Sequence, residues 1–116
     1  MNSKPQKILH VTTSKIWNQF QSLPFYETES LKNEGFIHNC TKGQLPNVIG
    51  RHFSSHQSLI LLEIETAMLE SPLLMEESYP NDWYPHIYGR LNKDAIIRVI
   101  PIEADSFGSF ILPDNL

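Results

Sequence analysis

Five histidines in a chain of 116 residues supply most of the side chains that could exchange protons near neutral pH. Three of them, His10, His38 and His86, stand in or beside runs of strand-forming residues. Side chains along a strand point alternately to its two faces, so such a histidine can face either a cleft or the core. These histidines therefore suit two roles: acid–base or ligand-binding groups in a cleft, and hydrogen-bonded residues of the interior.

Metal binding is a second chemistry open to imidazole, and the spacing argues against it. His38 and Cys40 share one face of a predicted strand, but no further close pair of His or Cys ligands accompanies them. His52 and His56 have the i, i+4 spacing of a helix, but the residues between them indicate that the helix is ending there. We therefore predict no structural metal.

Cys40 is the only cysteine and precedes a predicted helix start, a position that can lower the pKa of a thiol and make it nucleophilic. A lone cysteine in a strand also suits the role of a small buried apolar residue. Glycine-rich phosphate loops of the Gly-x-Gly-x-x-Gly and Gly-Lys-Ser/Thr types do not occur in the sequence.

Other polar residues suit a ligand that carries ribose and phosphate. Thr12 shares a strand face with His10, and Thr41 and Gln44 stand at a predicted helix start, where backbone N–H groups favour anions. Arg51 lies about two turns further along that helix. Helix capping and core packing would explain the same residues without a ligand. The candidate ligand-binding residues are Thr12, Thr41, Gln44, Arg51, His86, Tyr88 and Arg90.

These residues must be positioned by short strands and helices in alternation. Helices are predicted after Thr13 or Ser14, at 29–34 with Gly35 as its stop, and along the apolar series from Leu45 to Phe53. The segment 65–83 is acidic and punctuated by prolines, which indicates mostly loop. The predicted strands are 7–12, 36–40, 59–64 and 95–102, with shorter ones at 73–75 and 107–112. Crossovers are too few for a doubly wound sheet, so we predict an α+β fold.

Composition limits the function classes further. With 41% hydrophobic and 19% charged residues, the chain is predicted to form one globular domain over residues 1–116. A chain of this mass buries roughly 67% of its unfolded surface, enough for a core without metal or disulfide. The net charge of −4 argues against nonspecific nucleic-acid binding. A single cysteine and the lack of a secretory or membrane-spanning segment predict a cytoplasmic protein.

Four segments together resemble a known family. They are Ile-Leu-His-Val-Thr at 8–12, Ser-Leu-x-x-Glu-Gly-Phe-Ile-His at 30–38, Leu-Ile-Leu-Leu-Glu-Ile at 59–64, and Tyr-Pro-His-Ile-Tyr-Gly-x-Leu-Asn at 84–92. With Trp17, Thr41 and Gln44 they resemble the uncharacterised family DUF952, over about residues 8–102. We therefore expect His10, His38 and His86, one from each of three blocks, to converge on one cleft.

The resemblance implies a fold similar to ADP-ribosyltransferases, a split, curved β-structure with short helices around a cleft that holds NAD in active relatives. His10 then matches a histidine that contacts a ribose hydroxyl. His38 lies in a segment similar to the Val-His-Leu-Ser block of RNA 2′-phosphotransferases. Glu76 matches the acidic position of a Trp-Glu-x-Ser-Arg block, in which Met75 and Tyr79 replace the tryptophan and the arginine. Cys40 stands where the family usually has serine. The implied catalytic residues are His10, His38 and Glu76.

Two functions follow from this resemblance. In the first, the cleft binds a nucleotide or another phosphorylated ligand and the protein is a transferase that uses NAD or acts on a 2′-phosphate. In the second, the protein is a ligand- or protein-binding module that keeps the cleft without chemistry. Fold resemblance alone does not separate them.

Overall fold

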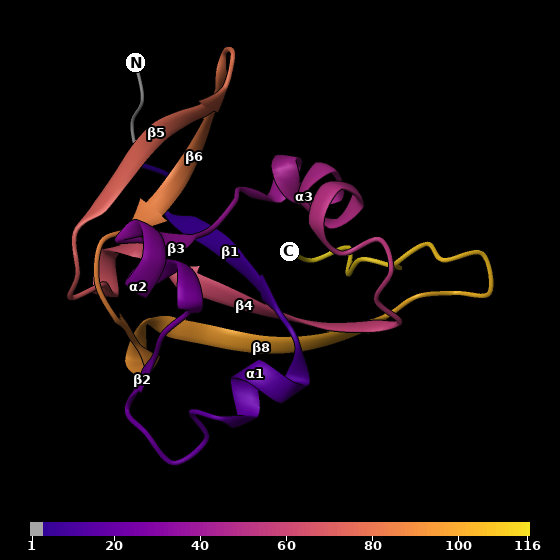
Figure 1. Cartoon of the computed structure of the whole chain (residues 1–116), viewed down its shortest axis with the longest axis horizontal. Helices are drawn as coiled ribbons and strands as arrows, with labels where there is room; N and C mark the ends of the chain where they lie inside the picture. Colours follow the sequence, from indigo (N-terminus) through magenta and orange to yellow (C-terminus); the bar gives the residue numbers. More distant parts are fainter. Residues whose placement is uncertain (1–3) are drawn as a thin grey trace.

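Two antiparallel sheets of three strands each form the framework of the computed structural model, which describes residues 4–116 (Figure 1). The strands are β1 (Lys7–Thr12), β2 (Phe25–Tyr26), β3 (Ile37–His38), β4 (Ser58–Glu65), β5 (Leu73–Tyr79), β6 (Asp82–Ile87), β7 (Leu91–Asn92) and β8 (Ile96–Glu103). The α-helices are α1 (Ser14–Asn18), α2 (Glu29–Glu34) and α3 (Leu45–His52). An α+β fold is therefore confirmed.

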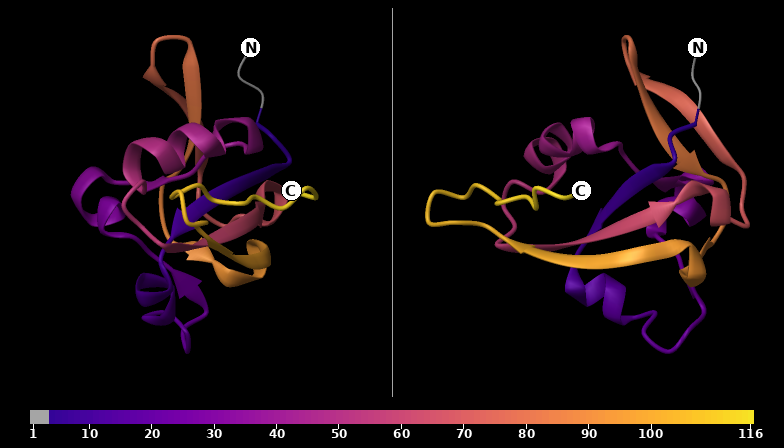
Figure 2. Two further views of the ribbon diagram at one scale, coloured as in Figure 1. Left: turned by 90° about the vertical axis from the view of Figure 1, so that its right-hand side faces the viewer. Right: turned by 180° about the vertical axis from the view of Figure 1, so that it is seen from behind.

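The first sheet has the order β1-β4-β8 and the second the order β3-β6-β5, while β2 and β7 form a separate short pair. A single bridge between Leu9 of β1 and Cys40, just after β3, joins the two sheets. The framework is thus split and curved rather than one continuous sheet (Figure 2). The split places the facing surfaces of β1, β3 and β6 around one space.

Alternate residues of β1 and β4 divide between two apolar cores. Ile8, Leu62 and Ile64 pack with Tyr26 and with residues of the second sheet. Leu9, Leu61 and their neighbours pack beneath α3, on the opposite face. Because both faces of this sheet are covered, the run 59–64 is apolar throughout except at Glu63.

Local signals place the short helices as predicted. The Thr13 side chain accepts a hydrogen bond from the Ile16 N–H and caps α1, with N···O 3.2 Å. Gly35 ends α2 with a φ of 92°, a left-handed conformation that glycine adopts without a Cβ penalty. The chain can therefore turn directly from α2 into β3, which begins two residues later at Ile37.

Two predictions about the second half of the chain are wrong. The segment 65–83 is not mostly loop, because β5 covers Leu73–Tyr79 and pairs with β6 through a tight turn at Asn81, whose φ is 62°. Acidic side chains tolerate strand conformation here because they lie on a partly exposed face. Residues 107–112 form no strand, since only the bridge between Ala104 and Phe110 links them to the sheet. The strand predicted at 36–40 is also shorter, at Ile37–His38.

Within residues 4–116, no helix has the length and apolar character that crossing a bilayer requires. α3 spans eight residues, which is far short of the about 20 that the hydrocarbon core demands.

Candidate functional site

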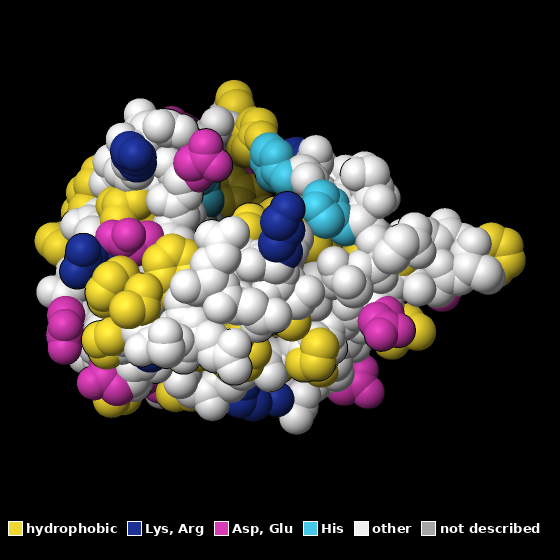
Figure 3. All heavy atoms as spheres, turned by 60° about the horizontal axis from the view of Figure 1, so that its bottom comes forward, with side chains coloured by type: hydrophobic (Ala, Val, Ile, Leu, Met, Phe, Trp, Pro, Cys, Tyr) yellow, Lys and Arg dark blue, Asp and Glu magenta, His cyan; other side chains and the backbone are white. Residues whose placement is uncertain are grey.

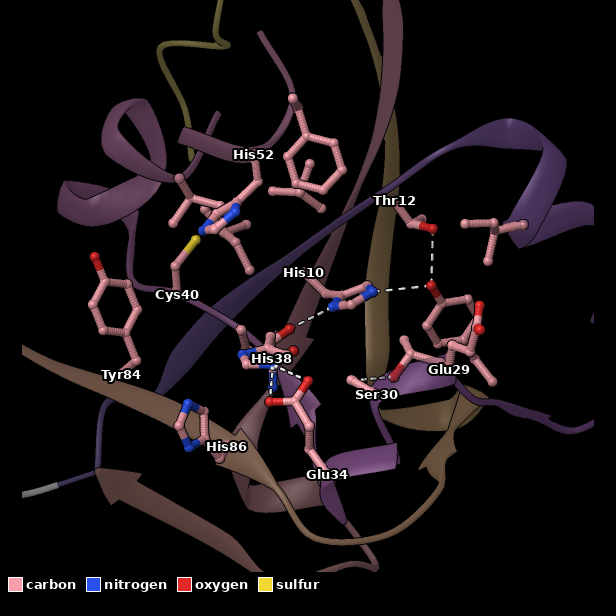
Figure 4. Close-up of a pocket in the computed structure, with 18 of the residues that line it drawn as sticks. His10, Thr12, Glu29, Ser30, Glu34, His38, Cys40, His52, Tyr84 and His86 are labelled. Carbon is pink, nitrogen blue, oxygen red and sulfur yellow. Dashed lines mark hydrogen bonds and ion pairs between the residues drawn. The ribbon is translucent and has the colours of Figure 1, made fainter. Parts of the chain in front are cut away.

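A cavity of about 1090 Å³ opens between α2, α3 and the facing surfaces of β1 and β6. We call it the histidine cavity, because His10, His38, His52 and His86 all line it. Figure 3 shows a hollow in the surface with apolar side chains inside and histidine, acidic and basic side chains around its rim. The interior view shows His10 and His38 at its centre (Figure 4).

The structure brings together part of the predicted set. The predicted residues that line the cavity are His10, Thr12, His38, Arg51 and His86. Those that do not line it are Thr41, Gln44, Glu76, Tyr88 and Arg90. The three histidines of the three sequence blocks therefore share one cavity, while their roles stay predictions.

His10 is buried and held at both ring nitrogens. Its Nδ1 lies 2.7 Å from the carbonyl oxygen of His38, and since a carbonyl only accepts, Nδ1 carries the proton. Its Nε2 lies 2.9 Å from the Tyr26 hydroxyl, whose oxygen is also 2.9 Å from Thr12 Oγ1. Burial lowers the pKa of His10 to about 4 and raises the pKa of Tyr26 to about 12. His10 is therefore a neutral group that ties β1 to β2 and β3.

We expect His10 to remain neutral far below the usual range of a histidine. Its imidazole should titrate near pH 4 in the folded chain, against 6.5 for an unperturbed histidine. Because the unfolded chain then binds the proton first, the free energy of unfolding falls as the pH drops from about 6.5 to about 4. An NMR titration of the five imidazoles measures this. A His10 midpoint near 6.5 would contradict the prediction.

His86 is buried against Phe36 and bound to a carboxylate. Its Nδ1 lies 2.8 Å from Glu76 Oε1, and the Tyr88 hydroxyl donates to the same oxygen at 2.5 Å. The hydrogen bonds from Tyr88 and His86 hold the pKa of Glu76 below its usual range. The ring of His86 stacks on Phe36 with centroids 4.0 Å apart and planes at 19°. Glu76 and Tyr88 thus lie behind His86 and fix its orientation.

His38 lies directly opposite His86 in the pairing of β3 with β6. Directly opposed residues project from the same face of a sheet, and the two rings meet edge to face with centroids 5.4 Å apart. His38 Nε2 contacts both carboxylate oxygens of Glu34, at 3.2 and 3.3 Å. Two histidines, each bound to a carboxylate, therefore stand side by side on the cavity wall.

Arg51 lies on α3 at the other end of the cavity. Its Nη1 donates to the Tyr84 hydroxyl at 3.3 Å, and its Cζ lies 4.0 Å from the centre of the Tyr79 ring. The two tyrosines belong to β6 and β5 respectively. Arg51 therefore places a positive charge over an aromatic wall.

The charges of the lining are arranged in two groups. Glu29, Lys32 and Glu34 of α2, with Glu27 just before it, line one part of the cavity, whereas Arg51 and His52 belong to α3. A ligand that fits both ends carries its negative charge towards α3 and its hydroxyl or cationic groups towards α2.

Comparison with known proteins places the chain in a family. The family model described as "Protein of unknown function (DUF952)" matches residues 11–99. The chain belongs to the DUF952 family. A search of the curated proteins found no match.

Solved structures of the protein CC0527 from Caulobacter crescentus are similar to this chain. Its crystal structure is 23% identical with a TM-score of 0.81, covering 90% of this chain and 93% of that chain. Its solution NMR structure is also 23% identical, with a TM-score of 0.76 and 90% of both chains covered. A crystal structure of a double mutant of CC0527 is 22% identical with a TM-score of 0.81, covering 90% of this chain and 93% of that chain. At this identity the likeness shows the fold alone.

The predicted anion site at Thr41 and Gln44 lies outside the cavity of this DUF952 chain. The Gln44 side chain accepts from the Thr41 N–H at 2.9 Å and donates to Asp82 and to the Trp83 carbonyl, each at 2.8 Å. Gln44 thus ties the start of α3 to β6. Helix capping, the alternative to ligand binding, is what these contacts show.

Two other residues that the sequence suggested for chemistry are an ion-paired arginine and a buried cysteine. Arg90 pairs with Glu27 at 2.9 Å and lies over the Phe25 ring, outside the histidine cavity. Cys40 lines the cavity but is buried, and burial raises its pKa to about 12, which leaves the thiol protonated. Among residues 4–116, no group of three or more His, Cys, Asp or Glu side chains has the arrangement of a metal site.

Sequence reasoning missed Tyr26 and Glu34. Tyr26 belongs to a strand of two residues, too short to leave a periodic pattern, yet its hydroxyl joins His10 to Thr12. Glu34 is four residues before His38, and because Gly35 turns the chain between them, the two side chains meet outside a helix. The i, i+4 spacing of an acid and a histidine was the available signal.

Proposed function

We propose that this DUF952 chain binds a nucleotide or a related phosphorylated molecule in the histidine cavity. The single observation that carries the proposal is Arg51, a cation fixed on two tyrosines at one end of a cavity of about 1090 Å³. A guanidinium binds phosphate oxygens through paired hydrogen bonds.

The rest of the lining suits the sugar and base of such a ligand. Small-molecule sites are mostly apolar and carry a few polar groups at fixed positions. Phe20, Val48 and Phe53 supply apolar surface here, while Glu29 and Ser30 present oxygen atoms at the α2 end. Carboxylates are common partners of ribose hydroxyls. The phosphate is therefore directed to Arg51 and the ribose to α2.

The resemblance to ADP-ribosyltransferases makes NAD the first ligand to test. NAD carries negative phosphates and a cationic nicotinamide ring. The phosphates suit the α3 end of the cavity, which has Arg51, and the nicotinamide suits the α2 end, which has Glu29 and Glu34. In this proposal the protein is a transferase that uses NAD or acts on a 2′-phosphate. Arg51, His38 and His86 are the residues expected to contact the ligand.

A binding module without chemistry is the second candidate, and the setting of His10 favours it. Both ring nitrogens of His10 are bonded within the protein, to the His38 carbonyl and to Tyr26. A histidine held in this way positions neighbours rather than exchanging protons with a ligand. In this candidate, saturable binding occurs with no turnover.

Arg51→Ala is expected to weaken nucleotide binding by about 10- to 150-fold, because a hydrogen bond to a charged group contributes about 1.5–3 kcal/mol. A thermal-shift screen of NAD, ADP-ribose and 2′-phosphorylated RNA ends identifies the ligand, since binding at 100 times Kd adds about 2.7 kcal/mol of stability. Calorimetric titration of the wild type and the variant then gives both affinities.

Arg90→Ala is the matched control for this experiment. Arg90 also lies over an aromatic ring and contacts a polar partner, but it does not line the histidine cavity. We expect the Arg90→Ala variant to bind the nucleotide with the affinity of the wild type. Equal affinities of Arg51→Ala and the wild type would place Arg51 outside the site.

A further inference from the structure

We propose that His86 and His38 are the base and the acid of a phosphodiester hydrolysis, with a cyclic nucleotide phosphate as the substrate class. This inference rests on the proposed function, because it requires a phosphate in the histidine cavity. It adds a reaction and assigns roles to two histidines and to the two glutamates that hold them.

The two histidines form a pair across two neighbouring strands. His38 and His86 are opposite each other in the register of β3 and β6, and their ring centroids are 5.4 Å apart. One ring nitrogen of each histidine contacts a carboxylate, Glu34 for His38 and Glu76 for His86. The other ring nitrogen of each histidine does not contact that carboxylate. Both side chains line the same cavity. Two imidazoles thus stand within reach of one ligand group.

The contact with Glu76 decides which ring nitrogen of His86 carries the proton. A carboxylate held ionised by Tyr88 and His86 can only accept, so Nδ1 of His86 donates to Glu76 Oε1. In the neutral ring Nε2 is then the acceptor, as a general base requires. The stack on Phe36 and the contact with Glu76 prevent the ring from turning. Glu76 is a positioning residue here, since it does not line the cavity.

His38 is more accessible to solvent protons than His86. Its side chain is 55% exposed, whereas that of His86 is 6% exposed. When His38 is protonated, Glu34 holds Nε2–H and the remaining donor is Nδ1–H. An exposed ring can regain its proton from solvent after each turnover. His38 therefore suits the acid and His86 the base.

Arg51 is the cation of the cavity that would hold the phosphate. Arg51 bonds to Tyr84, which stands two residues before His86 on β6 and so projects from the same face of the sheet. The Cα atoms of residues i and i+2 in a strand are about 6.6 Å apart. In this proposal the phosphate lies between Arg51 and the two imidazoles, since all three side chains line the same cavity.

The reaction needs no covalent intermediate. Cys40, the thiol of the cavity lining, is buried and protonated, so water is the nucleophile. His86 Nε2 removes a proton from water, and the water oxygen forms a bond to phosphorus. The bond from phosphorus to one ribose oxygen breaks, and that oxygen takes a proton from His38. The net change is cyclic diester plus water to phosphomonoester, after both histidines exchange protons with solvent.

The probe is 2′,3′-cyclic AMP, and the product is followed by phosphorus NMR. We expect the wild type to convert it to the monophosphate. His86→Asn is expected to lower kcat about 10²- to 10⁴-fold, the usual contribution of a general base. The amide nitrogen of asparagine can still donate to Glu76 in place of Nδ1, but the variant lacks Nε2. His38→Asn is expected to lower kcat over the same range.

Two further variants separate roles from structure. Glu76→Gln should lower kcat and leave KM unchanged, because it disturbs the orientation of His86 and not the phosphate contact. His56→Asn is the matched control, since His56 packs on Phe53 and does not line the cavity. We expect it to keep the wild-type kcat. Melting temperatures of all variants verify that they fold.

The outcomes distinguish the inference from the proposed function. Calorimetric binding of 2′,3′-cyclic AMP without hydrolysis by the wild type would overturn the inference and leave nucleotide binding intact. Hydrolysis that survives in both folded variants, His86→Asn and His38→Asn, would also overturn it. Failure to bind any nucleotide of the screen would overturn both.

Discussion

Arg98→Ala is expected to lower the free energy of unfolding by about 3–5 kcal/mol, because it strands a buried carboxylate. Glu63 lies in the middle of β4, is 3% exposed, and is directly opposite Arg98 on β8. Arg98 donates from Nε to Oε1 at 2.7 Å and from Nη2 to Oε2 at 3.0 Å. Without the guanidinium, the buried carboxylate loses both hydrogen bonds, and Lys7 is left as a nearby cation without a hydrogen bond to it. Urea denaturation at pH 7 measures the loss.

The pair of Glu63 and Arg98 also makes the stability of the wild type fall at acidic pH. Hydrogen bonding to Arg98 holds the pKa of Glu63 below its usual value of 4.5. The unfolded chain then binds this proton first as the pH falls. The stabilisation is therefore complete above about pH 4.5 and is lost as the pH drops through the folded pKa.

A double variant separates the cost of an unpaired charge from loss of packing. Glu63→Leu with Arg98→Met removes both charges and keeps similar volume, and such replacements of buried pairs are often neutral. We expect it to regain most of the stability that Arg98→Ala loses. If Arg98→Ala unfolds within about 0.5 kcal/mol of the wild type, the effect is that of an ordinary surface change and the prediction is wrong.

Tyr26→Ala is expected to lower the free energy of unfolding by about 3–5 kcal/mol, the range for truncating a buried aromatic ring. Tyr26 is fully buried, and its ring contacts those of Trp17, Phe20 and His10 with centroids 5.2 to 5.6 Å apart. It also belongs to the core that covers β1 and β4. Thermal and urea denaturation monitored by circular dichroism measure the loss.

Tyr26→Phe isolates the hydroxyl from the ring. It removes the oxygen that lies 2.9 Å from both His10 Nε2 and Thr12 Oγ1 and leaves those two buried atoms without it. The expected loss is about 1–3 kcal/mol, the cost of leaving buried polar groups unsatisfied. Equal stability of Tyr26→Phe and the wild type would show that the hydroxyl does not hold His10.

The arrangement of the site explains why three distant histidines share one cavity. His38 and His86 meet because β3 and β6 pair in register, and His10 joins them because its Nδ1 donates to the His38 carbonyl. The bridge between Leu9 and Cys40 sets the distance between the two sheets at this point. A shift of one residue in the pairing of β3 would turn His38 to the other face of its sheet.

Several elements follow from local sequence alone. The strand-forming residues around His10 specify β1, Thr13 specifies the start of α1, and Gly35 specifies the end of α2. The apolar spacing from Leu45 to Ile49 specifies the buried face of α3. These signals are local because each depends on the conformational preference of one residue or on the period of one element. The family blocks around His38 and His86 are also visible in the sequence.

Other features depend on tertiary contacts, and the local pattern indicated β5 only at 73–75. β5 contains Glu76, Glu77 and Ser78, which disfavour strands, and forms because β6 pairs with it across the turn at Asn81. Likewise, the residues at 107–112 favour a strand but have no partner strand beyond the bridge at Phe110.

The same contrast between local signals and long-range contacts applies to the histidine cavity. Residue type indicated that His10, His38 and His86 could do chemistry, but long-range pairing determines what each one contacts. Burial keeps His10 neutral while Tyr26 and the His38 carbonyl hold its ring, whereas Glu76 and Glu34 hold the other two. The hydrogen bonds of these histidines join segments up to 28 residues apart, as in the contact of His10 with His38, and His86 stacks on Phe36, which lies 50 residues earlier. A histidine's chemistry is set by that surrounding, which a single sequence does not specify.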